Sequence, residues 1–262
     1  MLPSANLTDD DLGVLALIMN DKYESAPIET NHYFCNGSYI REMVAPANTL
    51  IIGRVHKQGG FVNVLTKGRL ILRDESGEVK EVSAPYTFIA KSGGRKTAYT
   101  LEDTVWLNIH SINVSTVQDA EAETLEEEKP ELKDRFDFIK TISALGMSPD
   151  MVQAISEINC DLVDLDMDLF GVEFKESTIH GIGMFATRDF EENAIICPSR
   201  ICSFRTAAGR YTNHGANPNA ETVMLDNHSS HYKATKFIKS GDEIMIDYKQ
   251  AFDVARTMDG VK

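Results

Sequence analysis

The sequence of 262 residues lacks the features that mark a membrane-spanning or secreted protein. It contains no run of about 18 unbroken apolar residues, the length that a membrane-spanning helix requires. Its first residues, Met1 to Asp11, have neither a basic stretch nor an apolar core, so we expect no secretory leader. Only four cysteines are present, and no two of them form a CxxC pair. This usage is typical of a reducing compartment, so we expect a cytoplasmic protein without a disulfide framework.

Basic residues are scarce relative to acidic ones. The chain has 26 Lys and Arg against 40 Asp and Glu, which gives a net charge of −14. Duplex nucleic acid is therefore an improbable partner, because binding it needs clustered Lys and Arg, whereas a basic protein or peptide is favoured. Many of the acids lie between Asp119 and Asp137, a pattern typical of a solvated linker or an exposed helix face, with a docking segment as the alternative.

The hydrophobic pattern divides the chain into β-rich halves on either side of this acidic stretch. We expect a short N-terminal helix capped by Thr8, then several short strands up to about Val117, which indicate a small sandwich or barrel. Residues 132–159 predict two helices broken near Gly146, and strand patterns return from Phe170. The expected domains are residues 1–118, a helical linker over 119–168, and residues 169–262 ending in a helix. The predicted fold class is mainly β with some α.

Three segments of the C-terminal third carry the strongest motifs. They are His180-Gly-Ile-Gly-Met-Phe-Ala, Arg210-Tyr-Thr-Asn-His-Gly-Ala-Asn-Pro-Asn, and Gly241-Asp-Glu-Ile-Met-Ile-Asp-Tyr. In this order they resemble the SET-domain family of protein lysine methyltransferases, whose motifs are G-x-G-x-F-A, R-F-x-N-H-S-C-x-P-N and G-E-E-L-T-x-D-Y. The resemblance covers about residues 171–252 and implies a SET-like β-clip fold.

The resemblance also assigns site residues and a cofactor, S-adenosylmethionine. It makes Tyr248 the catalytic tyrosine and places Tyr211 in the substrate channel. It assigns cofactor binding to the Gly181-Ile182-Gly183 turn, where glycine allows close backbone approach, and to Asn213 and His214. The sequence departs from the family at Gly215-Ala216, where Ser-Cys is usual, and in the short stretch of residues 191–208, which in relatives builds one wall of the substrate groove.

The N-terminal half resembles the first cupin motif, G-x5-H-x-H-x3,4-E-x6-G. The matching residues run from Gly53 through His56 to Gly68, and similar segments occur in tailed-phage proteins. Gln58 stands in place of the second histidine and Asn63 lies near the glutamate position, so with His110 only two histidines remain. Two histidines do not make a metal-binding facial triad. We therefore expect a cupin-like barrel or sandwich without a metal.

Two interpretations of function stay open. The first is a SET-like protein lysine N-methyltransferase that transfers a methyl group from S-adenosylmethionine to a lysine-bearing protein or peptide. The second is a catalytically inactive SET/cupin protein, encoded by a phage and present in the host cytoplasm, that acts as a binding, ligand-sequestering or assembly module. Neither interpretation involves duplex nucleic acid or a membrane, and either allows a homo-oligomer formed through the cupin-like domain.

Overall fold

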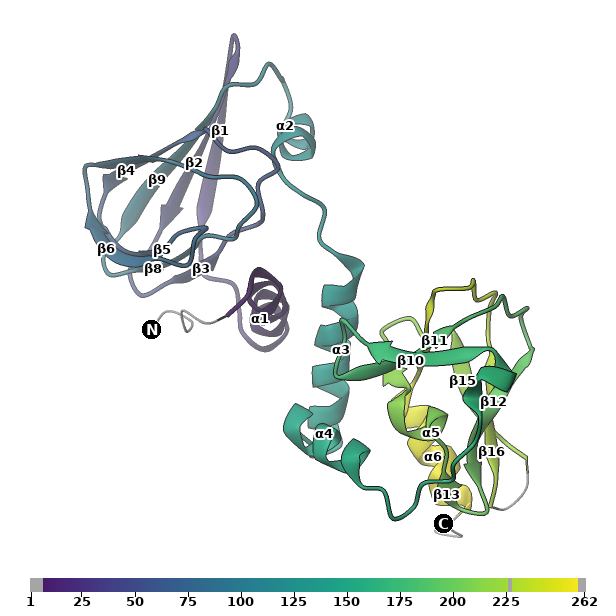
Figure 1. Ribbon diagram of the computed structural model, residues 1–262. Coiled ribbons are helices and arrows are strands. Elements are labelled where there is room, and N and C mark those ends of the chain that lie inside the picture. The colour runs from purple at the N-terminus through teal and green to yellow at the C-terminus, as the bar shows by residue number, and fades with distance from the viewer. Residues whose placement is uncertain (1–6, 226–227, 259–262) are drawn as a thin grey trace. The chain divides into compact units, whose positions relative to one another are not determined.

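The chain forms two compact units, Met1–Lys129 and Pro130–Lys262, in a computed structural model that describes residues 7–225 and 228–258 (Figure 1). Each unit has its own hydrophobic core and is described separately. No helix in the described part of the chain is long and apolar enough to cross a membrane.

The N-terminal unit begins with helix α1, Asp9–Lys22. Thr8 caps this helix: its hydroxyl accepts a hydrogen bond from the Asp11 amide, and the Asp11 carboxylate accepts one from the Thr8 amide. This reciprocal pair satisfies two amide groups that have no partner inside the helix. The cap predicted from the sequence is therefore confirmed.

Nine strands follow and form two sheets in the N-terminal unit. The five-stranded sheet has the order β1 (Glu29–Cys35), β2 (Ser38–Ala45), β9 (Thr104–His110), β4 (Val62–Lys67), β7 (Tyr86–Ile89). The four-stranded sheet has the order β3 (Leu50–Ile52), β8 (Thr97–Thr100), β5 (Arg69–Arg73), β6 (Val79–Ser83). Met43, Leu65 and Trp106 of the first sheet share one buried core with Leu72 and Ala98 of the second. The predicted β unit is confirmed as a two-sheet arrangement, and its described strands do not form a closed barrel.

Helix α2, Val117–Thr124, crosses the expected boundary between the first domain and the linker at residue 119. It belongs to the N-terminal unit, because the Lys57 amide donates to the Thr124 carbonyl and the Glu126 amide donates to the Val55 carbonyl. Its Ala120 is fully buried. The acidic stretch is thus divided, with α2 in one unit and the next helix in the other.

The C-terminal unit opens with two helices, α3 (Pro130–Ala144) and α4 (Pro149–Glu157). Ser148 caps α4 and Pro149 occupies its first turn, where the missing amide proton costs nothing. Gly146, with φ of 74°, makes the turn between the helices. The predicted helix pair and its break are therefore confirmed.

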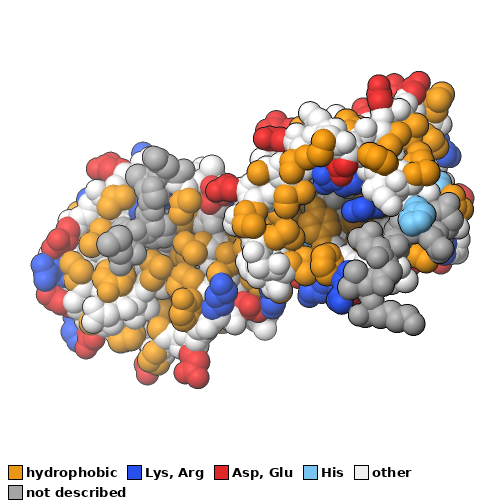
Figure 2. Space-filling model, turned by 90° about the horizontal axis from the view of Figure 1, so that it is seen from below, with side chains coloured by type: hydrophobic (Ala, Val, Ile, Leu, Met, Phe, Trp, Pro, Cys, Tyr) orange, Lys and Arg blue, Asp and Glu red, His pale blue; other side chains and the backbone are white. Residues whose placement is uncertain are grey.

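Two four-stranded sheets make up the rest of the C-terminal unit. One has the order β10 (Val172–Glu176), β11 (Ile182–Ala186), β17 (Glu243–Ile246), β14 (Asn213–His214). The other has the order β13 (Phe204–Arg205), β12 (Ile195–Ile201), β16 (Ser230–Ala234), β15 (Ala220–Met224). The remaining elements are the short helix η1 (Met167–Phe170), α5 (Ala208–Tyr211) and the final helix α6 (Tyr248–Met258). Figure 2 shows that one face of this unit is hollowed, with hydrophobic side chains at the base and basic side chains at the rim.

Candidate functional site

A parallel strand pair brings the second and third motifs together. β14 lies beside β17 with Asn213 opposite Met245 and His214 opposite Ile246. The chain then leaves β17 and begins α6 at Tyr248, whose amide donates to the His214 Nδ1 atom over 3.1 Å. Tyr248 therefore starts a helix that is fixed by its contact with the histidine of the other motif.

Asn213 connects this pair to the glycine turn of the first motif. Its buried side-chain amide donates to the His180 carbonyl at 3.0 Å and to the Glu243 carboxylate at 3.0 Å, and it lies 3.4 Å from the Ile182 carbonyl. All three motifs therefore meet at one amide group. Both hydrogens of the side-chain amide are therefore used within the protein.

Glu243 is a central residue that sequence reasoning did not assign to the site. Its carboxylate accepts hydrogen bonds from Asn213 and from the Ser177 hydroxyl, the latter at 2.9 Å. The Glu243 carboxylate also explains why glycine is present at position 183, because a Cβ atom there would lie 2.2 Å from the Glu243 Oε1 atom. Burial raises the pKa of the Glu243 carboxyl, while the hydrogen bonds from Asn213 and Ser177 act to lower it. The glutamate of the Gly-Asp-Glu motif was the signal that could have identified it.

The His214 ring is held on both sides. Its Nε2 atom lies 2.8 Å from the Asp137 carboxylate and 3.1 Å from the Thr141 hydroxyl, both on α3. A carboxylate only accepts hydrogen bonds, so Nε2 donates a proton to Asp137, while Nδ1 lies 3.1 Å from both the Tyr248 amide nitrogen and the Ile246 carbonyl oxygen. Asp134, one turn earlier, accepts the Ala216 amide proton at 3.0 Å. For Asp134 and Asp137, the expectation of a merely solvated acidic face is therefore wrong.

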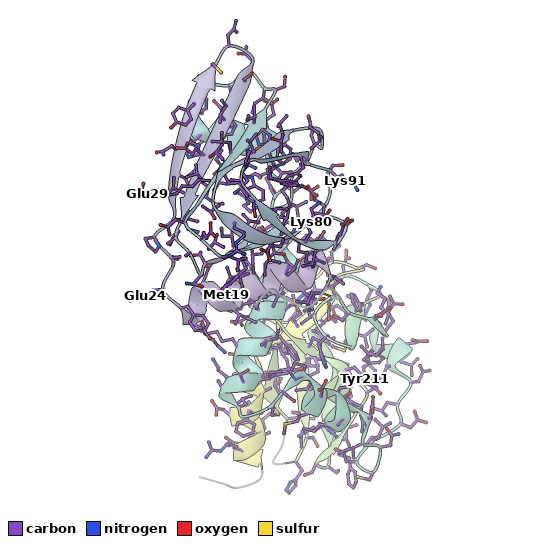
Figure 3. The ribbon with its side chains drawn as sticks, turned by 90° about the vertical axis from the view of Figure 1, so that its left-hand side faces the viewer. Met19, Glu24, Glu29, Lys80, Lys91 and Tyr211 are labelled. Atoms are coloured by element: carbon purple, nitrogen blue, oxygen red, sulfur yellow. The ribbon has the colours of Figure 1, made fainter. Side chains whose placement is uncertain are left out.

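Tyr211 ends α5 (Figure 3). Its ring packs against Phe174 of β10, with 5.7 Å between the ring centroids. The neighbouring Arg210 is buried and donates to the Ser156 carbonyl and to Asp161. Arg210 thereby joins α5 to the segment that follows α4, and it fixes the start of the second motif.

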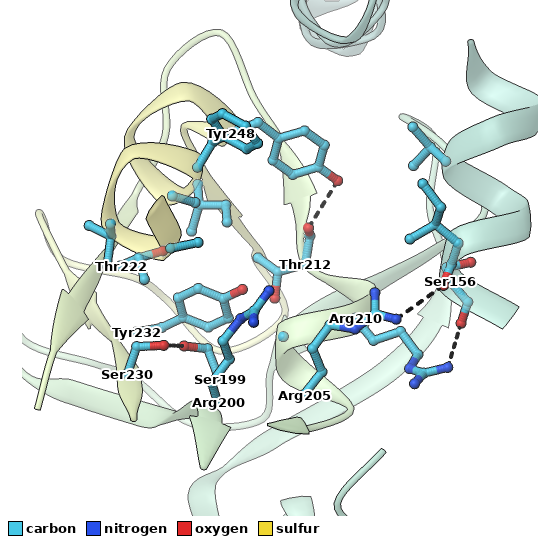
Figure 4. Close-up of a pocket in the computed structure, with 18 of the residues that line it drawn as sticks. Ser156, Ser199, Arg200, Arg205, Arg210, Thr212, Thr222, Ser230, Tyr232 and Tyr248 are labelled. Carbon is cyan, nitrogen blue, oxygen red and sulfur yellow. Dashed lines mark hydrogen bonds between the residues drawn. The ribbon is translucent and has the colours of Figure 1, made fainter. Parts of the chain in front are cut away.

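The Tyr248 hydroxyl donates to the Thr212 carbonyl over 3.2 Å (Figure 4). The ring is held by the His214 ring, with centroids 5.4 Å apart, and by an edge contact with Phe138 at 6.2 Å. Burial raises the pKa of the Tyr248 hydroxyl, and the Glu243 carboxylate raises it further. The phenol is therefore protonated at neutral pH, so it can donate a hydrogen bond but cannot act as a base.

A cavity of about 270 Å³ adjoins this tyrosine. One side is apolar and comes from the turn between α3 and α4 and from helices α4 and α6, through residues such as Met147, Val152 and Phe252. The opposite side is polar and includes Arg200, Arg205, Arg210, Thr212, Thr222 and Tyr232 (Figure 4). The cavity thus combines an apolar wall with a basic one, and Tyr248 and Thr212 present oxygens to it.

The polar wall contains groups without protein partners. The Thr222 hydroxyl and the Arg210 Nε atom are buried and have no hydrogen-bond partner among the described residues. Arg205 and Arg210 both pair with Asp161, whereas Arg200 has no carboxylate within ion-pair distance in the described part of the chain. Buried polar groups without partners are uncommon in folded proteins, so this wall has hydrogen-bonding capacity that the described protein groups do not use.

The predicted site residues form two groups in the structure, one at the cavity and one beside it. Tyr248 lines the cavity. Gly181, Ile182, Gly183, Asn213 and His214 lie beside it and are not among the residues that line the described cavity. Helices α3 and α4 approach this second group through Asp137 at His214 and through Gln153, whose Oε1 atom lies 2.8 Å from where a Cβ at Gly181 would be. The roles predicted for these five residues, for Tyr211 and for Tyr248 stay predictions.

A family model described as SET domain matches residues 200–249. The match includes the β14–β17 pair and both Thr212 and Tyr248. The C-terminal unit contains a SET domain. No curated protein matches the chain.

Solved structures resembling parts of the chain include a cupin and a putative histone methyltransferase. Part of the chain is similar to a Plasmodium falciparum putative histone methyltransferase, with 24% identity, a TM-score of 0.26, and coverage of 30% of this chain and 92% of that one. Part of the chain is also similar to KdgF from Halomonas sp., with 15% identity and a TM-score of 0.30. This match covers 36% of this chain and 93% of the KdgF chain. An RmlC-like cupin from Shewanella frigidimarina gives 13% identity, a TM-score of 0.30, and coverage of 37% and 83%.

The residues of the N-terminal unit do not fit the metal that a cupin motif implies. His56 and His110 stack with their ring centroids 5.5 Å apart, and Asn63 uses its carbonyl oxygen to accept from Trp106 and Asn108. Within residues 7–225 and 228–258, no three His, Cys, Asp or Glu side chains gather in a metal-binding arrangement. Burial lowers the pKa of both histidines, and the nearby cations Lys96 and Arg41 lower it further; the same positive charges would oppose a bound metal ion.

Proposed function

We propose that the protein is a SET-type methyltransferase that transfers a methyl group from S-adenosylmethionine to a lysine side chain of a protein or peptide. The observation that carries this proposal is the Tyr248 hydroxyl, bonded to the Thr212 carbonyl on the wall of a cavity in the C-terminal unit. The family match supports methyl transfer as the reaction class, and the residues that line the cavity support S-adenosylmethionine as the cofactor.

The cavity has the groups that this cofactor requires. S-Adenosylmethionine supplies a methyl group on a positively charged sulfur, which transfers in line to a neutral amine. Arg200 and the unpaired Thr222 hydroxyl are suited to the carboxylate and other polar atoms of such a molecule, and the apolar wall is suited to its less polar parts. The oxygens of Tyr248 and Thr212 favour a methyl group that carries partial positive charge, through weak C–H···O contacts.

Tyr248 acts in this proposal by positioning. Its protonated hydroxyl keeps the oxygen at a fixed point, because the ring is held by His214 and Phe138. The lysine amine must lose its proton before it attacks, and an apolar surrounding favours that loss by lowering the amine pKa. Tyr248 therefore aligns the amine and the methyl group and does not remove the proton.

The substrate proposed is a basic protein or peptide. The chain carries a net charge of −14, so long-range electrostatics favours a partner of opposite charge. A homo-oligomer formed through the N-terminal unit remains part of the proposal.

The test is the transfer of a labelled methyl group from S-adenosylmethionine to the proteins of a lysine-rich extract. Tyr248→Phe keeps the ring but removes the hydroxyl, so we expect transfer to fall about 100-fold, which is typical of losing one positioned group. Cofactor affinity, measured by calorimetry, should be unchanged. Tyr99→Phe removes a hydroxyl in the N-terminal unit, where it bonds Asn48 at 3.3 Å, and serves as the matched control.

The proposal fails if the wild-type protein neither binds S-adenosylmethionine nor labels any protein. A catalytically inactive binding or assembly protein would then be the better interpretation. Equal transfer by the wild type and Tyr248→Phe would instead support the methyltransferase activity and show that the Tyr248 hydroxyl is not needed for it.

A further inference from the structure

A second cavity of about 270 Å³ lies inside the N-terminal unit, between its two sheets. Strands β2, β4 and β9 arrange their inward-facing side chains in layers that follow from the strand register. Arg41 lies opposite Asn108, which lies opposite Asn63. Two residues further along, Met43 lies opposite Trp106. A polar layer therefore lies directly beside an apolar one.

Ile51, Leu72 and Ala98 of the other sheet extend the apolar layer. On the other side of the polar layer, Tyr39 lies opposite His110, and the His110 ring stacks on Phe61 with centroids 4.3 Å apart. The end of α2 lines the cavity through Glu121 and Thr124. The enclosed space is thus apolar at one end and polar in the middle.

The polar layer carries an uncompensated positive charge. Three cations line the cavity, Arg41, Arg54 and Lys96. Lys96 is paired with Glu75 at 2.9 Å, and Arg54 lies 3.8 Å from Glu121. Arg41 is half-buried, lines the cavity and has no hydrogen-bond or ion-pair partner among the described residues. In a chain with a net charge of −14, an unpaired guanidinium in a cavity points to an anionic ligand.

Other polar groups in the same cavity also lack partners. The His56 Nδ1 atom and the Thr97 hydroxyl are buried and unpaired, and both residues line the cavity. Burial lowers the pKa of His56 to about 3 and of His110 to about 4, with Lys96 contributing in both cases. Both imidazoles are therefore neutral at pH 7 and can act as hydrogen-bond partners without adding charge. One surplus cation and several neutral hydrogen-bonding groups match a singly charged anion better than a doubly charged one.

We propose that this cavity binds a small organic carboxylate, whose anionic group pairs with Arg41 and whose carbon body lies on the apolar layer of Met43 and Trp106. Guanidinium and carboxylate groups match in geometry and can form two parallel hydrogen bonds. This site is independent of the SET domain and of the methyl transfer proposed there.

Trp106 allows the site to be tested directly, because it is the single tryptophan of the chain and lines the cavity. The full-length protein is titrated with benzoate and hexanoate, and separately with benzamide and hexanamide, while tryptophan fluorescence is recorded. We expect a saturable change with at least one acid, and at least tenfold weaker binding of its neutral amide. An absence of response to both acids, or equal affinity for an acid and its amide, would overturn the proposal.

Variants of Arg41 separate charge from shape. Arg41→Met should weaken acid binding at least tenfold, and Arg41→Lys should keep the preference for the acid over the amide at reduced affinity. Arg69→Met is the matched control, because Arg69 is exposed on β5 and pairs outside the cavity with Glu81 and Glu102. Circular dichroism establishes that each variant is folded. Undiminished binding by a folded Arg41→Met protein, or stoichiometric Zn²⁺ binding that displaces the acids, would contradict the assignment.

Discussion

Acid is expected to destabilise the N-terminal unit well before its carboxyl groups titrate. The cause is His56 and His110, whose rings are enclosed beside Lys96 and Arg41. Burial is the main reason that the pKa of His56 falls to about 3 and that of His110 to about 4, and the neighbouring cations act in the same direction. In the unfolded chain, both rings would titrate near pH 6.5.

The direction of the effect follows from proton uptake. Between pH 6.5 and 4 the unfolded chain holds protons on both rings and the folded unit does not, so the free energy of unfolding rises with pH in this range. Above pH 6.5 both states are neutral and this contribution is constant. Lowering the pH from 7 to 5 should therefore cost roughly 2 kcal/mol for each histidine, or about 3–4 kcal/mol for the pair.

Urea denaturation at pH 7, 6 and 5, followed by Trp106 fluorescence, measures this effect in the N-terminal unit alone. The SET domain contains no tryptophan and does not contribute to the signal. The control is a double variant, His56→Asn with His110→Asn, in which neither side chain titrates. Its stability should vary much less between pH 7 and 5. An equal pH dependence in the wild type and the double variant would refute the reasoning.

Two further predictions concern the SET domain. Asp137→Asn removes the charged acceptor of the His214 Nε2 proton and should lower the free energy of unfolding by about 1 kcal/mol, measured by circular dichroism, with Glu131→Gln on the same helix as the control. Gly183→Ala places a Cβ against the Glu243 carboxylate and should cost about 1–3 kcal/mol. That cost should shrink in a Glu243→Ala background, so strict additivity of the two substitutions would contradict the proposed clash.

The elements that the sequence predicted are those with local signals. Thr8 followed by three aspartates, and Ser148 followed by Pro149, specify helix starts through contacts within four residues. Short runs of branched and aromatic residues between glycine-rich turns correctly predicted strands such as β4, β5 and β9. The end of the third motif was less well predicted: its Tyr248 begins α6, because the His214 ring accepts its amide proton.

Parts of the site that depend on distant contacts could not be predicted. The parallel pairing of β14 with β17 joins residues about thirty positions apart, and β14 is only two residues long, so it has no periodicity of its own. The motifs indicated that Asn213, His214 and Tyr248 lie in one site. They did not indicate which polar groups of that site would have no hydrogen-bond partner in the protein. The cavity is formed around Tyr248 by α4, α6 and the strand that carries Arg200. These elements are far apart in the sequence, so no local pattern predicts the cavity.

The acidic stretch, residues 119–137, also contains a helical spacing that its net charge does not reveal. Asp134, Asp137 and Thr141 are spaced by three and four residues, which places them on one face of α3. The neighbouring positions Phe138 and Ile142 are buried, so this face was already marked as the inner one by its apolar residues. A carboxylate beside such a stripe lies at the edge of the buried face, where it accepts hydrogen bonds from neighbouring elements. His214 and the Ala216 amide are those donors, and they belong to the motif that the SET resemblance had already identified.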